Sequence, residues 1–113
     1  MLRDEGWLLD ILLAARRVST YMEGVSEEEF RKDQMLQDAV VKRLEIIGEA
    51  AGQLSPECKG KHPGLPWPLI VGMRNRLIHE YFNVDLAVVW ETARNDIPKL
   101  IDQIEPLVPP EEA

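Results

Sequence analysis

Apolar residues recur every three or four positions along most of the chain, which is the spacing that places them on one face of an α-helix. This spacing first predicts a helix over residues 4–23, which Gly24 ends. Ser26, followed three residues later by Glu29, is a capping-box pattern at the start of a second, short helix.

The next helix is predicted over residues 33–54, where an apolar seam runs for about six turns without proline. Ser55 and Pro56 are expected to stop it, and the residues from there to Pro66 have the glycine and proline content of a loop. A loop of about ten residues is long enough to suspect a function. The seam consists of Leu36, Val40, Leu44, Ile47, Ala51 and Leu54.

Two more helices complete the pattern. One is predicted from about residue 66 to 82, because proline is tolerated only in the first turn of a helix. Asp85 can cap the last helix, within which Pro98 predicts a kink or a restart with Asn95 or Asp96 as a new cap.

No segment alternates with period two for long enough to be a strand, and no internal repeat is visible. The 113 residues can close a modest hydrophobic core. We therefore expect an all-α fold, an antiparallel bundle of four to five helices, in a single domain over residues 1–113 with a frayed tail over 106–113.

Charge and composition restrict the binding partners and the cellular compartment that we expect for the protein. The net charge of −7 disfavours unspecific attraction to nucleic acid, but residues 37–82 hold six basic and five acidic residues, so a local positive cleft is compatible with the sequence. No apolar run approaches the roughly 18 residues of a membrane span, and Cys58, in the expected loop, is the only cysteine. Both features favour a cytoplasmic protein.

Arg74 draws attention because the helical spacing places it in the middle of an apolar seam. A guanidinium keeps its charge at any relevant pH, so it must extend to the surface, pair with an acid, or serve as a receptor for an anion. Glu45 and Glu49 are candidate partners for a purely structural pair. The pattern leaves these interpretations open.

His79 lies about 140° around the same predicted helix from Arg74, so the two side chains cannot meet on one straight helix. Gly72 and Asn75 lie on the same side of the predicted helix as His79. The missing side chain at Gly72 would let another backbone approach closely. We expect that backbone to belong to a second copy of the chain, with Arg74 and His79 converging in a cleft at the interface.

The two side chains together suffice for metal-independent cleavage of RNA. An imidazole can transfer the proton of a ribose 2′-OH, and a guanidinium can stabilise the charge that builds on the phosphate. Asn75 could orient the phosphate or His79. His62 and His79 are the only histidines and form no close pair for zinc, so neither a metal nor another cofactor is expected.

The segment Arg74 to Tyr81 resembles the signature of HepT toxins, the HEPN partner in type VII toxin–antitoxin pairs. Arg74 is followed at once by Asn75, five residues later by His79, and two residues after that by Tyr81. The run Leu44 to Ala50 resembles the second long helix of that family, and Leu65 to Trp67 resembles the lead into its motif helix. Similarity spans about residues 5–105.

This resemblance implies a HEPN fold and a homodimer that cleaves messenger or transfer RNA without a metal ion, with Arg74 and His79 as the catalytic pair. It also implies that a minimal nucleotidyltransferase antitoxin attaches AMP units to Tyr81. Such groups would add bulk and negative charge beside Arg74 and close the cleft to RNA.

Two alternatives belong to other classes of protein. One is a non-catalytic HEPN module that binds a nucleotide or docks a nucleotidyltransferase. The other is a plain helical dimerisation protein, in which Arg74 is held in an internal salt bridge far from His79. For Tyr81, the residues alone favour a core aromatic whose hydroxyl reaches the surface.

Overall fold

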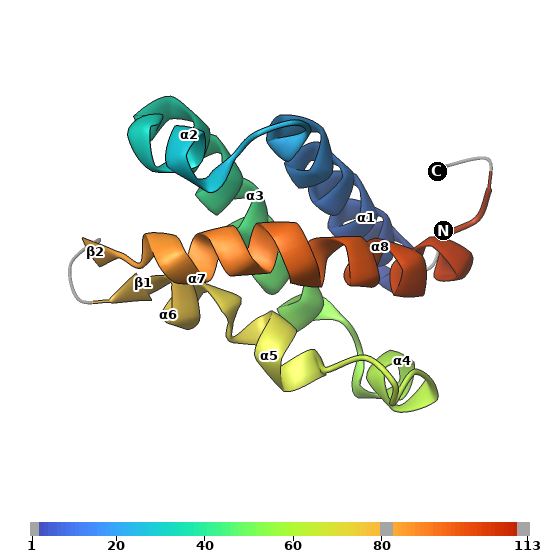
Figure 1. The fold of residues 1–113 in the computed structure, drawn as a ribbon. Helices are drawn as coiled ribbons and strands as arrows, with labels where there is room; N and C mark the ends of the chain where they lie inside the picture. Colours follow the sequence, from blue (N-terminus) through green and yellow to red (C-terminus); the bar gives the residue numbers. More distant parts are fainter. Residues whose placement is uncertain (1–2, 80–82, 111–113) are drawn as a thin grey trace.

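A computed structural model describes residues 3–79 and 83–110, apart from the side chain of His79. Two long helices, α1 (Arg3–Met22) and α3 (Gln34–Gln53), lie side by side and bury their apolar faces against each other (Figure 1). The predicted all-α class is confirmed. Among the residues described, every helix is too short or too polar to span a lipid bilayer.

The third long stretch is a nearly continuous helical rod that crosses α1 and α3 (Figure 1, orange to red). It joins α7 (Leu86–Glu91), a π-helical turn η1 (Thr92–Asp96) and α8 (Ile97–Ile104). The predicted restart is confirmed, because Pro98 lies in the first turn of α8 and the wide π-turn precedes it. Asp96, however, makes no side-chain cap hydrogen bond.

The chain packs further toward its C-terminus than predicted. A 3₁₀ turn, η2 (Glu105–Leu107), follows α8, and Val108 is only 4% exposed. Arg16 of α1 also contacts Glu105 with a nitrogen to oxygen distance of 2.8 Å. Residues that were assigned to a frayed tail from position 106 thus contribute to the core as far as Val108.

Helix starts follow the local signals closely. Ser26 and Glu29 form the predicted capping box of α2 (Glu27–Lys32): the Glu29 amide donates to Ser26 Oγ at 3.1 Å, and the Ser26 amide donates to Glu29 Oε1 at 3.0 Å. Asp85 caps α7 as predicted, accepting from the amide of Val88 at 3.2 Å. These caps satisfy amides that have no partner within their own helices.

The predicted loop after α3 is wrong in part, because it contains α4 (Pro56–Lys61). Ser55 and Pro56 do end α3, but they also start α4: Ser55 Oγ accepts from the amide of Cys58, and Pro56 occupies the first turn. Cys58 is buried in this helix rather than lying in a loop. Burial raises the pKa of its thiol, and the nearby Asp4 carboxylate raises it further.

Asp4 ties the start of α1 to the start of α4, and this tie makes stability dependent on pH. Its two carboxylate oxygens accept from the amide and the hydroxyl of Ser55 at 2.9 and 2.7 Å, and these hydrogen bonds lower the pKa of Asp4. The folded chain therefore favours the charged form, so this stabilisation is full above the unfolded pKa of about 3.9 and is lost as pH falls through the lowered folded pKa.

We therefore expect Asp4→Asn to lower the free energy of unfolding at pH 7 and to lower it less near pH 3. Urea unfolding of both proteins at the two pH values measures this difference. Asp10→Asn, an exposed position on the same helix, is the control. An equal loss at both pH values would contradict a role for the carboxylate charge.

Candidate functional site

The segment that carries the motif is not the single helix predicted over 66–82. It consists of α5 (Trp67–Val71) and α6 (Met73–Leu77), which are separated at Gly72, and is followed by the two-residue strand β1 (Ile78–His79). Gly72 has the lowest helix propensity of any residue in this stretch except proline, and its ψ of 9° leaves the α-helical range. The helical-wheel placement of Arg74 and His79 therefore does not apply.

The segment leaves the helical conformation after Leu77, because residues later in the chain supply its backbone hydrogen bonds. The amide of Asp85 donates to the carbonyl of Leu77 at 2.8 Å. β1 pairs antiparallel with β2 (Asn83–Val84), with Ile78 opposite Val84 and His79 opposite Asn83. This corrects the expectation that the chain has no strand. Extended Ile78 is β-branched, which favours this conformation.

Buried side chains at helical spacing fix α5 and α6 to the core. Trp67, Ile70, Met73 and Leu77 are all less than 9% exposed. The indole nitrogen of Trp67 also donates to the carbonyls of Lys59 and His62, at 3.1 and 3.0 Å, and so holds the start of α5 against the end of α4. One face of the segment is thus committed to the core, and the opposite face is left for other contacts.

Gly48 of α3 lets the motif segment approach that helix closely. A Cβ atom built at Gly48 would lie 3.1 Å from the carbonyl oxygen of Ile70 and 3.6 Å from Cβ of Met73. Gly48 thus permits a close approach within one chain, whereas the approach predicted at Gly72 concerns a second copy. At Gly72 an added Cβ would meet only the carbonyl of Pro68, in the segment itself, within 4 Å.

This packing brings Glu45 of α3 beside Arg74 of α6. Arg74 Nε lies 3.9 Å from Glu45 Oε2, which is an ion-pair distance but too long for a hydrogen bond. The Arg74 side chain is 58% exposed and that of Glu45 is 31% exposed. Arg74 therefore does not lie in an apolar seam, as the helical spacing predicts, but projects from the surface with a loosely held acidic partner.

Arg74 and Asn75 together line an open hollow of about 500 Å³ between α6 and α3. A second hollow of about 560 Å³ lies toward β1 and β2, and Glu45 lines both. The structure thus brings Arg74 and Asn75 to one surface, whereas the helical spacing places Asn75 on the side of His79. The other residues around the first hollow are Glu45, Gly48, Glu49, Gly52, Gln53 and Val71.

The remaining predicted site residues are only partly described. The backbone of His79 lies in β1, two residues after the end of α6, and its side chain lies outside the described part of the chain. Tyr81, the predicted AMP acceptor, also lies outside the described residues. Among the residues that are described, no three His, Cys, Asp or Glu side chains are placed to hold a metal ion.

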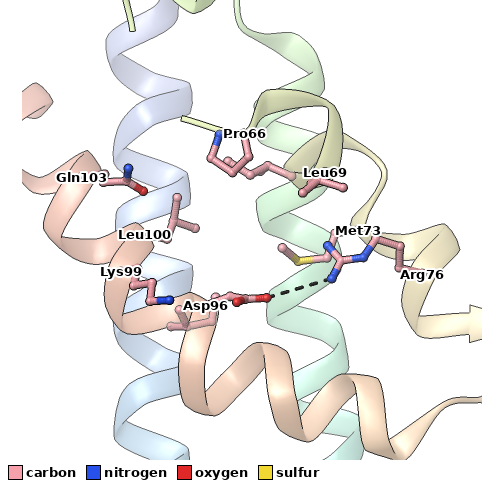
Figure 2. A pocket seen from close by; sticks show the side chains of 10 residues that line it. Pro66, Leu69, Met73, Arg76, Asp96, Lys99, Leu100 and Gln103 are labelled. Atoms are coloured by element: carbon pink, nitrogen blue, oxygen red, sulfur yellow. Dashed lines mark ion pairs between the residues drawn. The ribbon is translucent and has the colours of Figure 1, made fainter. Parts of the chain in front are cut away.

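A separate cavity of about 170 Å³ lies behind the motif segment, between it and α8. Figure 2 shows Arg76 reaching over this cavity toward Asp96, with a nitrogen to oxygen distance of 4.0 Å. We did not predict this cavity from sequence. Helical spacing gives no signal for it, because Ile70 lies on α5, whereas Met73 and Arg76 lie on α6 beyond the break at Gly72.

Comparison with known proteins gives a consistent result. A family model described as "Ribonuclease HepT-like" matches residues 11–107. A "Putative RNase" of Caldanaerobacter subterraneus subsp. tengcongensis is 46% identical over 87 residues, covering 77% of this chain and 78% of that protein. A "Probable ribonuclease HepT" of Thermococcus cleftensis is 40% identical over 101 residues, covering 89% and 92%. No solved structure matches the chain.

Proposed function

We propose, since the chain belongs to the HepT-like ribonuclease family of HEPN proteins, that it is an endoribonuclease that cleaves RNA without a metal ion. One observation supports this most directly: the Arg74 guanidinium is 58% exposed at an open hollow, where a phosphate can reach it. Incubation of the purified protein with total RNA in EDTA tests the proposal. RNA that stays intact at all protein concentrations would overturn it.

In this mechanism Arg74 binds the scissile phosphate and stabilises the negative charge that develops on its oxygens. His79 takes the proton of the ribose 2′-OH, and the 2′ oxygen attacks the phosphorus to form a 2′,3′-cyclic phosphate. The bond to the 5′ oxygen of the next nucleotide breaks, and this oxygen takes up a proton from water. Asn75, on the same hollow as Arg74, orients the phosphate through its amide. Arg74 can exchange its loose contact with Glu45 for a phosphate at little cost in free energy, because both side chains are partly exposed to solvent.

The proposal includes a homodimer, in which the catalytic cleft receives side chains from both copies. Arg74 lies on α6 and His79 on β1, beyond the end of that helix, so they belong to different elements. A second copy facing the hollow would exclude water from the phosphate, and a guanidinium acts more strongly there than in an open surface site. The substrate is messenger or transfer RNA.

The proposed regulation is that of a toxin of a type VII toxin–antitoxin pair, with a minimal nucleotidyltransferase as the antitoxin. We expect this antitoxin, with ATP, to raise the mass of the protein by whole AMP units on Tyr81, and modified protein to lose RNA cleavage through repulsion of phosphate. Intact-mass spectrometry measures the addition. Tyr81→Phe should abolish it and Tyr21→Phe, at the only other tyrosine, should not. Equal addition to both variants would contradict the assignment.

One observation favours the alternative of a plain helical dimerisation protein. Arg74 has an acidic partner in Glu45, and that alternative holds Arg74 in an internal salt bridge. The expected phenotype separates the ribonuclease from this alternative and from a non-catalytic docking module. Expression without a partner should arrest growth through RNA cleavage, and His79→Ala should relieve the arrest, whereas both other proteins are harmless in either form.

A further inference from the structure

The cavity behind the motif segment has an apolar interior between three helices and opens to the surface. Its floor comes from α5 and α6 on one side and from α8 on the other (Figure 2). Leu69, at its edge, is 56% exposed and extends the apolar surface outward. The apolar lining residues are Pro66, Leu69, Ile70, Met73, Ile97 and Leu100.

The rim of the cavity is polar and carries a local excess of positive charge. Arg76, Asp96, Lys99 and Gln103 line it, which gives a net charge of +1 on a protein whose total is −7. Arg76 and Asp96 are only loosely paired at 4.0 Å, and no ion pair of Lys99 is found within residues 3–79 and 83–110. An incoming carboxylate could therefore pair with Lys99 and Arg76.

The size of the cavity indicates what would enter it. Small-molecule sites usually enclose about 300–1,000 Å³, whereas an apolar cavity of about 150 Å³ is enough for benzene. A cavity of about 170 Å³ therefore fits one aromatic or branched side chain. Pockets of this kind, with an apolar centre and a polar rim, receive the anchor residues of protein partners.

From these features we infer that the cavity is a docking site for a protein segment in which an aromatic anchor residue is flanked by acidic residues. The aromatic ring fills the cavity between Ile70 and Leu100, and the carboxylates pair with Lys99 and Arg76 at the rim. This inference is independent of the proposed ribonuclease activity, because no residue of the catalytic pair takes part in it.

Docking in the cavity would also affect the hollow that Arg74 and Asn75 line. Met73 and Arg76 of α6 line the cavity, whereas Arg74 and Asn75 of the same short helix line the hollow between α6 and α3. Met73 lines the cavity and is followed directly by Arg74, so a ring that displaces Met73 also displaces the backbone of Arg74. A partner bound at the cavity therefore changes the surroundings of Arg74 without touching it.

The blocked peptide acetyl-Glu-Phe-Asp-amide, titrated into the ¹⁵N-labelled full chain at low salt, tests the inference. We expect saturable shifts of the amide signals of Ile70, Met73, Ile97 and Leu100, accompanied by smaller shifts at Arg74 and Asn75. Lys99→Glu should weaken binding about fivefold, since it replaces an attraction at an exposed site by a repulsion. Lys61→Glu makes the same charge change at an exposed position outside the cavity and should leave the affinity unchanged.

Acetyl-Glu-Ala-Asp-amide, which keeps the charges but lacks the ring, separates docking from simple charge attraction. If it binds as tightly as the first peptide, or if Lys99→Glu binds as tightly as wild type, the inference fails. Sedimentation over a range of protein concentrations tests whether a second copy of the chain occupies the cavity instead. Self-association that shifts the same amide signals would assign the cavity to a second copy and overturn the separate partner.

Discussion

Arg74→Ala is expected to lower the rate of RNA cleavage by about 10²- to 10³-fold, the usual cost of removing one group that stabilises charge in the transition state. His79→Ala is expected to lower it by about 10²- to 10⁴-fold through the loss of proton transfer. Arg74→Ala should not unfold the protein, because Arg74 is exposed and its contact with Glu45 is loose. Single-turnover cleavage of a labelled RNA in EDTA measures both effects.

The chain offers a matched control for each substitution. Arg31→Ala removes a surface arginine that is paired with Glu27 on α2, and His62→Ala removes the only other histidine. Both controls should cleave at the rate of wild type, and thermal unfolding should show that all four variants are folded. Wild-type cleavage by either Arg74→Ala or His79→Ala would remove that residue from the proposed mechanism.

Mixing the two inactive variants tests whether the cleft lies between copies. If Arg74 of one copy works with His79 of the other, a mixed dimer contains one cleft with both residues intact, and cleavage returns in part after subunit exchange. A site within a single copy predicts no recovery, because each chain lacks one member of its pair. Full activity of wild-type protein that sediments as a monomer would also contradict the shared cleft.

Local signals in the sequence were sufficient for most of the scaffold. The capping box at Ser26, the cap at Asp85 and the restart at Pro98 were all predicted, because each depends on side chains within a few residues of the helix end. For Ser55 and Pro56, the end of α3 was predicted but the start of α4 was not. The same two residues end one helix and begin the next, and the sequence pattern of a stop does not exclude a start.

The motif segment could not be predicted in the same way, because its conformation depends on contacts from distant parts of the chain. The hydrogen bond from the amide of Asp85 to the carbonyl of Leu77 fixes the end of α6. The missing side chain of Gly48 lets α6 approach α3, which brings Glu45 beside Arg74. A helical wheel assumes one straight helix and has no access to either contact.

This difference changes the support for the candidate site. The helical spacing predicts Arg74 as a charge in an apolar seam, whereas its side chain lies at the surface. The assignment now rests on the exposed guanidinium at the hollow and on membership of a ribonuclease family. For His79 and Tyr81 the proposal continues to rest on the resemblance of the motif.

Phe30→Ala is expected to lower the free energy of unfolding by about 3–5 kcal/mol, the usual cost of removing a buried phenyl ring. Phe30 is fully buried, its ring centre lies 5.8 Å from that of Trp90, and Gln37 Nε2 donates to its carbonyl at 2.9 Å. The ring is the buried side chain by which the six-residue helix α2 is held against α3 and α7. Since small domains are stable by only about 5–15 kcal/mol, this change removes a large share of the total.

Urea unfolding followed by circular dichroism measures the loss, and Met35→Ala is the control. Met35 is 82% exposed on α3, so its truncation should change the free energy of unfolding by no more than about 0.5 kcal/mol. A loss of less than about 1 kcal/mol for Phe30→Ala would mean that α2 contributes little to the core. Because Phe30 is outside both hollows and the cavity, folded Phe30→Ala protein should still cleave RNA well below its unfolding midpoint. The scaffold and the candidate site can therefore be weakened separately, which allows a loss of cleavage in Arg74→Ala to be assigned to chemistry rather than to unfolding.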